Sequence, residues 1–425
     1  MKTLKQIKYQ TPILAYTDVN LNTQIIYMKN NILVINCGSS SLKCSLINPV
    51  NGDIIFFALA EKLFTQDALI SFKQGEIKQT TPLISPYDHQ AAIQSLVAFL
   101  TQQSLHSSIC AIGHRVVHGG EKYSQPTLIS EQVKTSINEL AKLAPLHNPA
   151  NLQGINAAET IFSNLPQVAI FDTAFHQSMP EKAFLYALPY SLYKEHGIRK
   201  YGFHGTSHYF VCKNAAKILD KPLEQCNFIS AHLGNGCSIS AVKNGKSVDT
   251  SLGLTPLEGL MMGTRSGSID PGIIFHLVEQ LGYSLEQVNI LLNKESGLLG
   301  VSQLTNDCRE LEQASADGND LAQLALQIFC YRIAKMIASF VPCFMQLDGL
   351  IFTGGIGENS QFVRSQVLAQ LSLLNFTEDQ SANQHCRFGQ SGNISTENSR
   401  PCWVIPTNEE WVIAEQSYQL LNGAK

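Results

Sequence analysis

Three glycine-rich turns, each placed directly after a run of apolar residues, constrain the fold of this chain more than any other feature. A buried strand that ends in glycine and small polar residues presents backbone N–H groups to an anion, because no side chain blocks the approach. Three such turns predict a polyphosphate cradle and make a nucleotide the first ligand to consider. The apolar runs and the turns that follow them are 32–35 with 36–41, 228–231 with 232–236, and 350–353 with 354–359.

The first two turns are spaced like copies of one unit. A shift of 196 residues places Gly38 on Gly234. Each turn leads into a second apolar run and then into an Asn-Gly dipeptide, at 51–52 and at 244–245, which is a strong hairpin signal. The duplication predicts two similar domains that face a shared cleft, whereas two unrelated hairpins would produce the same spacing.

Familiar motifs of other nucleotide-binding proteins and hydrolases fail in this chain. The Gly-Lys-Ser at 245–247 ends like a Walker A loop, but Ser240 occupies the position that requires its first glycine. The turn at 354–359 lacks the third glycine of a dinucleotide fingerprint, because Ser360 stands there. No Gly-x-Ser-x-Gly elbow is present. A P-loop, a Rossmann site and a serine hydrolase are therefore disfavoured.

Composition bounds the protein class. A chain of 425 residues with 44% hydrophobic and 15% charged residues is long enough for two domains with sizeable cores. The net charge of -4 and the absence of a basic block argue against nucleic acid and against an anionic membrane as partners. No apolar run approaches the roughly 20 residues of a spanning helix. Eleven cysteines without a Cys-x-x-Cys pair indicate reduced thiols and a cytoplasmic protein.

Residues 1–27 stand apart from the rest of the sequence. They contain three lysines but no apolar core of signal-peptide length, which argues against secretion. Met28 leads directly into the first strand, as a natural start would. We expect residues 1–27 to be an upstream in-frame extension, and a short ordered arm is the alternative.

Strand and helix patterns alternate along the chain, which indicates an α/β fold. Short strands are expected within 31–86, and a helix with Ser130 as its N-cap is expected to carry its apolar residues from Val133 to Leu143. Ser284 and Gln287 form a capping-box pattern. Other expected elements are a strand at 168–171, a long apolar helix over 321–345, a strand at 403–405, and a terminal helix that returns to pack on the first domain.

Four compact polar clusters lie between the glycine turns, at 113–120, 171–176, 202–208 and 263–267. Arginine beside glycine suits a bidentate clamp on phosphate or carboxylate, because the backbone lets the ligand approach the planar guanidinium. Aspartate at a strand end serves as a base, a nucleophile or a metal ligand. Simpler readings also fit single residues: a solvated surface arginine, a metal pair at His114 and His118, or a His208 that bonds within its own helix.

The clusters and turns together resemble the acetokinase family, which belongs to the superfamily of actin-like sugar kinases and Hsp70. The likeness runs from about residue 31 to residue 423 and includes many long stretches in order, which is far stronger than any one motif. These stretches are 36–43, 113–123, 171–180, 199–208, 232–236, 249–270, 354–360 and 406–410.

The resemblance implies an α/β fold with two duplicated actin-like (RNase H-like) domains around a nucleotide cleft. It places 28–173 together with 399–425 in the first domain and 174–398 in the second, nucleotide-binding domain. It also implies the reversible conversion of ATP and acetate to ADP and acetyl phosphate, by direct in-line transfer, in a homodimer. A route through a phosphorylated enzyme is the alternative mechanism. A propionate or butyrate kinase of the same family is the close alternative. A non-enzymatic nucleotide switch of the actin or Hsp70 kind is the more distant one.

The resemblance assigns catalytic and metal-binding roles to five residues. Asp172 matches the acidic residue essential to catalysis, and His204 and Arg265 match the groups that stabilise the transferring phosphoryl group. Asn36 and Glu409 match positions linked to Mg²⁺, with Mn²⁺ as an alternative ion. One departure is Ser268, which stands where the family has an aspartate near Arg265 and so removes a negative charge.

The resemblance also assigns the substrate and nucleotide contacts. Arg115 matches the arginine that holds the carboxylate substrate, beside an apolar pocket for the acetate methyl group. The residues of that pocket are Val117, Leu146, Phe203 and Pro256. The nucleotide contacts are Lys43, His232, Leu233, Gly234, Asn235, Gly236, Asp307, Cys308, Arg309, Gly355, Ile356, Gly357, Glu358 and Asn359.

Overall fold

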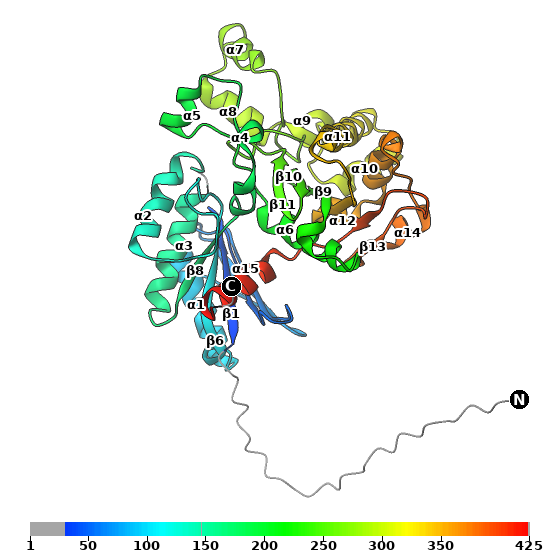
Figure 1. Ribbon diagram of the computed structural model, residues 1–425. Helices are drawn as coiled ribbons and strands as arrows, with labels where there is room; N and C mark the ends of the chain where they lie inside the picture. Colours follow the sequence, from blue (N-terminus) through cyan, green and yellow to red (C-terminus); the bar gives the residue numbers. More distant parts are fainter. Residues whose placement is uncertain (1–29, 146, 424–425) are drawn as a thin grey trace, which may run out of the picture.

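The computed structural model describes residues 30–145 and 147–423, and these residues form two β-sheets with helices packed on them (Figure 1). The first sheet has eight strands in the order β5-β4-β3-β2-β1-β6-β8-β7, and the second has six in the order β11-β10-β9-β12-β14-β13. The first sheet comprises β1 (Asn31–Cys37), β2 (Leu42–Ile47), β3 (Ile54–Glu61), β4 (Leu69–Gln74), β5 (Ile77–Pro82), β6 (Ile109–Val116), β7 (Thr127–Leu128) and β8 (Gln167–Phe171). The second comprises β9 (Asn227–Leu233), β10 (Cys237–Lys243), β11 (Lys246–Thr250), β12 (Gly349–Thr353), β13 (Gly392–Asn393) and β14 (Cys402–Val404).

The helices fall into two groups along the chain. Those before the second sheet are α1 (His89–Gln102), α2 (Glu131–Glu139), α3 (Asn148–Ile161), α4 (Glu181–Phe184), α5 (Tyr190–His196) and α6 (Gly205–Ile218). Those after its first three strands are α7 (Gly272–Glu279), α8 (Leu285–Lys294), α9 (Gly297–Ser302), α10 (Cys308–Ala316), α11 (Asp320–Ser339), α12 (Gly354–Asn359), α13 (Gln361–Ala369), α14 (Gln380–His385) and α15 (Glu409–Leu421).

The two sheets share one topology, which confirms the predicted duplication. In the first sheet β1 pairs antiparallel with β2 and parallel with β6, and β6 pairs parallel with β8. In the second sheet β9 pairs antiparallel with β10 and parallel with β12, and β12 pairs parallel with β14. Both Asn-Gly dipeptides make the expected hairpin turns, with Gly52 at φ 80° and Gly245 at φ 73°. The architecture is a pair of actin-like α/β domains.

Strand β1 shows how alternating side chains build two layers around the first sheet. Leu33 and Ile35 lie in the apolar core beneath α1 and α3. Ile32 and Val34 point to the other face, where they pack with Ile413 of α15. Strands buried on both faces in this way need nearly continuous apolar sequence. Figure 1 shows α15 beside β1, so the terminal helix returns to the first domain as predicted.

Strand β9 divides its side chains in the same way, and this division prepares the site. Ile229, Ala231 and Leu233 enter the core beneath α11. Phe228 lies in the core on the α6 side, and alternation along the strand therefore directs Ser230 and His232 toward α6 as well. One face of the second sheet thus carries polar side chains in a buried layer.

Several local predictions are confirmed and two are corrected. Ser130 accepts a hydrogen bond from Val133 N at the start of α2, and Ser284 with Gln287 forms the capping box of α8. The long helix α11 ends at Ser339 instead of 345, because Pro342 in the following short 3₁₀ helix cannot continue the hydrogen-bond pattern. The predicted domain boundary at 399 placed 402–404 in the first domain, whereas β14 pairs with β12 in the second sheet.

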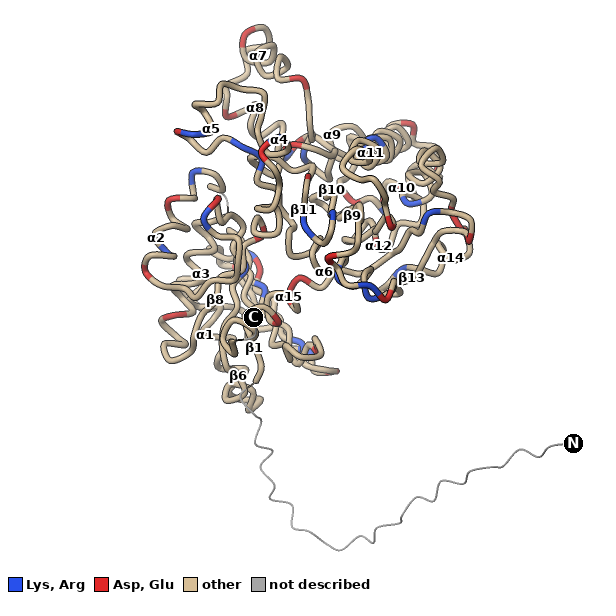
Figure 2. The backbone as a smooth tube through the Cα atoms, viewed as in Figure 1, with Lys and Arg blue, Asp and Glu red and all other residues tan. Residues whose placement is uncertain are grey.

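The segment Asp320–Cys343 corrects a third expectation, because it is long and apolar enough to cross a membrane by length and composition. Nine of its residues are buried in the structure, and they belong to the core beneath the second sheet. Apolarity there follows from packing between α10, α13 and the sheet. Figure 2 shows Lys and Arg interspersed with Asp and Glu over both domains, in line with the lack of a basic block in the sequence. The predicted extension 1–27 lies outside the described residues.

Candidate active site

The first half of the site forms at the carboxyl ends of three neighbouring strands of the first sheet. Asn36 lies near the end of β1, Arg115 near the end of β6, and Asp172 directly after β8. Ends of parallel strands meet at one edge of a sheet, where open α/β folds bind ligands. Arg115 donates to Asp172 Oδ2 from Nε at 3.0 Å and from Nη2 at 2.5 Å, and Nη1 lies 3.5 Å from Asn36 Oδ1.

Burial and pairing compete at this ion pair. Asp172 has no exposed surface. Burial raises the pKa of Asp172, and the guanidinium of Arg115 opposes that increase. Burial alone would lower the pKa of Arg115, but Asp172 and Glu409 raise it above its ordinary value. Two hydrogen bonds from the guanidinium to Asp172 Oδ2 fix the two groups together at the edge of the sheet.

The second domain meets the first at Asp172. Gly205 N, at the start of α6, donates to Asp172 O at 2.9 Å, and a Cβ on Gly205 would strike that carbonyl. Thr206 Oγ1 lies 3.5 Å from Asp172 Oδ1 and donates to Glu409 Oε2 at 3.2 Å. One hydroxyl from α6 therefore connects two carboxylates that come from distant parts of the chain.

His204 and His232 form the second half of the site with the glycine turn after β9. His204 has φ 57° directly before α6, and its ring stacks on His232 with centroids 4.3 Å apart. A Cβ on Gly236 would lie 3.7 Å from both His204 Nε2 and Arg265 Nη1, so these nitrogens converge on the turn. Burial lowers the pKa of His204 well below its ordinary value, with further contributions from His232, His208 and both arginines.

Arg265 lies on the other side of the same turn. Its Nη1 donates to Pro256 O at 3.1 Å. Burial lowers its pKa, and among the residues that the structure describes no carboxylate forms an ion pair with it. A half-buried cation without a counter-ion favours an incoming anion. Arg115 and Arg265 thus differ, since only Arg115 has its charge balanced.

Ser268 fits this loop by hydrogen bonding. Its Oγ accepts from Gly259 N at 2.9 Å, and its own N–H donates to Gly259 O at 3.0 Å. These two bonds close the loop 259–268, which carries Arg265. A serine hydroxyl supplies the acceptor that an aspartate would supply, without adding a negative charge beside Arg265.

The predicted nucleotide residues fall into an aligned group and a displaced group. Gly354 begins α12 directly after β12, and Glu358 Oε1 accepts from Gly354 N at 2.9 Å and from Thr407 N at 3.0 Å. Asn235 O accepts from Gly263 N at 3.0 Å, which ties the second turn to the arginine loop. The other predicted nucleotide residues of the aligned group lie in the turn after β9 or in the turn after β12. They are Gly234, Gly355, Ile356, Gly357 and Asn359.

The displaced group contains residues whose side chains have other partners. Leu233 and Cys308 are buried in the core of the second domain, which leaves only their backbone for a ligand. Asp307 caps α10 and pairs with Arg309 at 2.6 Å, and the Arg309 side chain is 87% exposed. Lys43 forms an ion pair with Glu410.

The predicted apolar pocket is brought together in part. Val117 and Phe203 come from different domains and join one buried cluster. Pro256 is half-buried, and its carbonyl accepts from Arg265. Leu146 lies outside the described residues.

Three residues near the site were not found from the sequence. His147 precedes α3, and its pKa is lowered by burial and then by the charges of Arg115 and Arg265. The clue to His147 in the sequence was its position directly after Leu146, which the resemblance assigns to the acetate pocket. Thr206 and Ser238 were also missed, since a lone hydroxyl carries no motif.

Paired arginines beside phosphate-type turns, held between two duplicated actin-like domains, define the protein as a phosphotransferase. The acetokinase family model matches residues 31–415, and the chain belongs to that family. It is 57% identical over 392 residues to an acetate kinase of Shewanella sp. (strain MR-4), covering 92% of this chain and 98% of the relative.

Two solved structures are similar over nearly their whole length. A propionate kinase from Francisella tularensis is 47% identical with a TM-score of 0.87, covering 91% of this chain and 98% of that one. The acetate kinase of Porphyromonas gingivalis is 41% identical with a TM-score of 0.88, covering 92% of this chain and 100% of that one.

The buried histidines predict a loss of stability in acid. Burial lowers the pKa of His114 and of His176 from 6.5 to about 4. Above pH 6.5 both are neutral whether the chain is folded or unfolded; between 6.5 and 4 only the unfolded chain binds the protons. The free energy of unfolding should therefore fall through this window by about 1.4 kcal/mol per histidine and per pH unit.

Urea unfolding across this pH window measures the effect. His114→Gln should reduce the slope by about one proton, because it removes one titrating group. His276→Gln changes an exposed histidine and is the matched control, with the wild-type slope expected. A free energy of unfolding that stays constant from neutral pH down to pH 5 would contradict the prediction.

Proposed function

We propose that this protein transfers the γ-phosphoryl group of ATP to the carboxylate of acetate and catalyses the reverse reaction. The observation that carries this proposal is the asymmetry between the two arginines. Arg115 is balanced by Asp172, so it suits a monovalent carboxylate, whereas Arg265 lacks a counter-ion and suits the more highly charged phosphoryl group. Membership of the acetokinase family and the acetate kinase relatives support this assignment.

The geometry supports direct in-line transfer. Arg115 uses Nε and Nη2 on Asp172, and the Nη1 hydrogen that does not face Asn36 is left to hold an acetate oxygen. The acetate oxygen attacks the γ-phosphorus, and the bond from phosphorus to the β–γ bridging oxygen breaks, so that ADP leaves. Arg265 neutralises charge on the equatorial oxygens, and His204 donates a hydrogen bond to them. No general base is required, because an ionised carboxylate is already a nucleophile.

Mg²⁺ is the proposed metal, with Mn²⁺ as the alternative. Asn36 Oδ1, Asp172 and Glu409 provide amide and carboxylate oxygens, which are the ligands that Mg²⁺ prefers. Arg115 and Thr206 connect these three groups by hydrogen bonds, so the donor set fits such an ion. When bound, the ion would neutralise charge on the nucleotide phosphates.

The choice between acetate and a longer acid depends on the apolar pocket. One methylene separates substrates by only about 1–3 kcal/mol in such a pocket. Val117 and Phe203 fill space at the site, which favours the small methyl group of acetate. The similarity to a propionate kinase keeps propionate as the second candidate.

A non-enzymatic nucleotide switch is the candidate of another class. It would share the phosphate turns but would not need an acceptor site. Four residues favour the enzyme, because a switch that only binds a nucleotide would not need this set of charged and hydrogen-bonding groups. They are Arg115, Asp172, His204 and Arg265.

Truncation of Arg265 tests the catalytic assignment. Arg265→Ala should lower kcat by on the order of 10³, as loss of an arginine finger does, with a smaller change in the KM for ATP. Arg387→Ala removes an exposed arginine and is the matched control, with wild-type kcat expected. A kcat of Arg265→Ala within tenfold of the wild type would refute the role of Arg265.

Truncation of Val117 tests the pocket. Val117→Ala should make room for about one methylene, and the preference for acetate over propionate should fall roughly 10-fold. Val133→Ala shortens a buried valine of a separate core and should leave the ratio unchanged. The measurement is kcat/KM for both acids, and an unchanged ratio in Val117→Ala would remove Val117 from the pocket.

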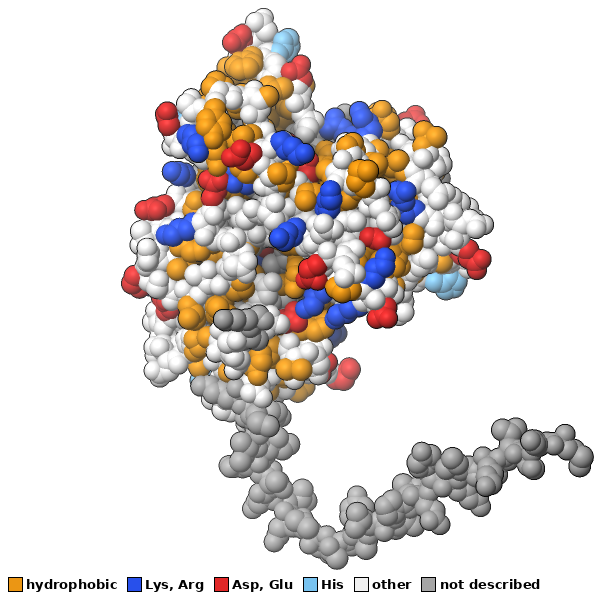
Figure 3. Space-filling view, viewed as in Figure 1, with side chains coloured by type: hydrophobic (Ala, Val, Ile, Leu, Met, Phe, Trp, Pro, Cys, Tyr) orange, Lys and Arg blue, Asp and Glu red, His pale blue; other side chains and the backbone are white. Residues whose placement is uncertain are grey.

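A homodimer is proposed from the apolar surface around α7 and α8. Phe275 is 61% exposed and Leu285 is 71% exposed, and Ile273 and Leu281 lie beside them in the sequence with more than 40% exposure. Figure 3 shows hydrophobic side chains on this projecting end of the molecule as well as over the rest of the visible face. An exposed apolar patch of this kind marks an interface. A cytoplasmic location is proposed from the reduced, buried thiols, such as Cys37 and Cys212.

Charge placed on this patch tests the dimer. Light scattering should give twice the 46.7 kDa chain mass for the wild type and the single chain mass for Phe275→Glu with Leu285→Glu. Burying two carboxylates at an apolar interface opposes association. Leu373→Glu places the same charge at a residue that is 99% exposed elsewhere and should remain dimeric. A monomeric wild type would overturn the dimer.

A further inference from the structure

A chain of four side chains runs through the buried polar layer between α6 and the second sheet. Ser230 Oγ lies 2.9 Å from His208 Nδ1, and His208 Nε2 lies 2.8 Å from Ser238 Oγ. Ser238 Oγ in turn lies 2.9 Å from His204 Nδ1. Ser230, His208 and Ser238 have no exposed surface, so water does not compete for their hydrogen bonds.

The sequence builds this chain by two regular spacings. Strand alternation directs Ser230 of β9 and Ser238 of β10 to the face that α6 covers. His204 directly precedes α6 and His208 lies in its first turn, where His208 N donates to His204 O at 3.0 Å, so the two residues lie about one turn apart. Ser238 Oγ therefore lies between the two rings.

The positions of the hydrogens follow from counting acceptors. Within 30–145 and 147–423, Ser230 Oγ has one hydrogen-bond partner, His208 Nδ1. A buried hydroxyl hydrogen without an acceptor costs about 1–3 kcal/mol. Ser230 therefore donates to His208 Nδ1, which places the ring hydrogen of neutral His208 on Nε2.

The same argument continues to the site. His208 Nε2–H donates to Ser238 Oγ, so the hydroxyl hydrogen of Ser238 must go to its second partner, His204 Nδ1. His204 Nδ1 then accepts, and the ring hydrogen of His204 lies on Nε2. That nitrogen is the one that converges with Arg265 Nη1 on the turn at Gly236.

We propose that Ser230, His208 and Ser238 are positioning residues that fix His204 as a neutral imidazole with its hydrogen on Nε2, ready to donate to the transferring phosphoryl group. The proposal rests on the proposed function of His204 in phosphoryl transfer. A neutral imidazole with the opposite tautomer would present a lone pair to the phosphoryl oxygens and repel them.

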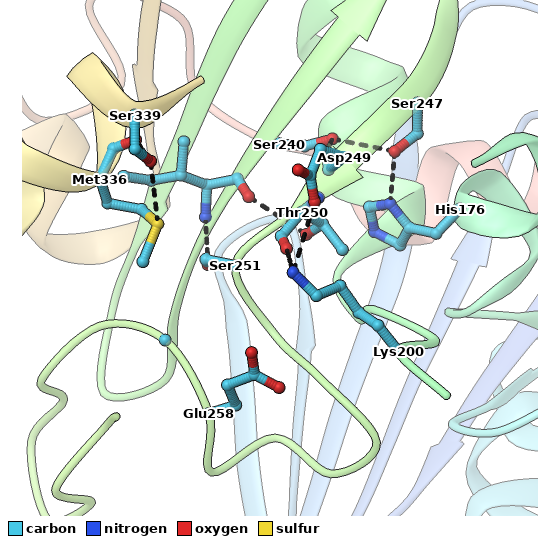
Figure 4. Close-up of polar contacts among 12 residues, drawn as sticks. His176, Lys200, Ser240, Ser247, Asp249, Thr250, Ser251, Glu258, Met336 and Ser339 are labelled. Carbon is cyan, nitrogen blue, oxygen red and sulfur yellow. Dashed lines mark hydrogen bonds and ion pairs between the residues drawn. The ribbon is translucent and has the colours of Figure 1, made fainter. Parts of the chain in front are cut away.

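A second serine–histidine arm holds the backbone beside His204. His176 Nε2 donates to Phe203 O at 3.0 Å, and Ser247 Oγ donates to His176 Nδ1 at 2.8 Å. Figure 4 shows Ser247 between His176 and Ser240, on the same face of the sheet. This arm anchors the carbonyl directly before His204, whose φ of 57° lies in the left-handed region.

Nitrogen NMR of the full-length wild-type protein tests the tautomer directly. With ¹⁵N-histidine at neutral pH, two-bond ¹H–¹⁵N spectra distinguish protonated from unprotonated ring nitrogens, and the His204→Gln spectrum identifies the His204 signals. We expect a protonated Nε2 and an unprotonated Nδ1. A protonated Nδ1, or comparable amounts of both tautomers, would overturn the proposal even in an enzyme that phosphorylates acetate at full rate.

Kinetics of serine variants test whether the tautomer matters. Ser238→Ala should lower kcat roughly 10- to 100-fold, with little change in either KM. This loss is smaller than the roughly 10²–10³-fold loss in kcat that follows removal of a group that itself donates to the transition state. Ser238→Thr keeps the hydroxyl and should restore most of kcat, and Ser230→Ala should give a smaller loss and a mixed tautomer. Ser45→Ala, at a buried serine whose Oγ has no partner, is the matched control.

Two kinetic results would contradict the proposal. One is a Ser238→Ala enzyme with kcat within twofold of the wild type. The other is a folded Ser238→Thr enzyme as slow as Ser238→Ala. A wild type without acetate kinase activity would instead refute the proposed function and leave the tautomer assignment to the NMR spectrum.

Discussion

The interdomain site depends on the contact at which Asp172 is held from both domains. Arg115 of the first sheet forms an ion pair with its carboxylate, and Gly205 of the second domain donates to its carbonyl oxygen. Gly205 is required because a Cβ would strike that carbonyl. This close approach places the start of α6, and with it His204 and Thr206, against the carboxyl edge of the first sheet. The proposed substrate arginine, Arg115, and the proposed phosphoryl-binding groups belong to one site only because the two domains meet here.

Charge is distributed across this contact in two different ways. On the first sheet, the positive charge of Arg115 is balanced by a fully buried carboxylate. On the second, Arg265 has no acidic partner among the described residues, and the stacked rings of His204 and His232 are kept neutral by burial. Two neutral imidazoles can stack at 4.3 Å, whereas two charged ones would repel. Positive charge is thus concentrated on one guanidinium, and the imidazoles contribute oriented N–H groups.

The sequence predicted those features that depend on local pattern. The glycine turns, the Asn-Gly hairpins, the Ser130 cap and the return of the terminal helix follow from spacing and turn chemistry, and the resemblance located both arginines. Neither the local patterns nor the resemblance revealed which of the assigned side chains the fold buries. Leu233 and Cys308 point into the core, and Asp307 is paired with Arg309. The link from Ser230 to His204 depends on the register of β9 with β10 and on the position of α6, which no single segment encodes. The boundary at 399 was wrong because the pairing of β14 with β12 is a long-range contact.

Isotope transfer tests most directly the central claim that a carboxylate oxygen attacks the γ-phosphorus. The enzyme is given ATP and acetate labelled with ¹⁸O in its carboxylate, and the product is cleaved with hydroxylamine, which breaks the bond between the acyl carbon and the bridging oxygen. Attack by the carboxylate places one acetate oxygen in the bridge, so the phosphate released should carry one ¹⁸O atom. Phosphate without ¹⁸O would mean that the acetate oxygen never bonded to phosphorus, and it would contradict the assignment of Arg115 and Arg265 to acceptor and phosphoryl group.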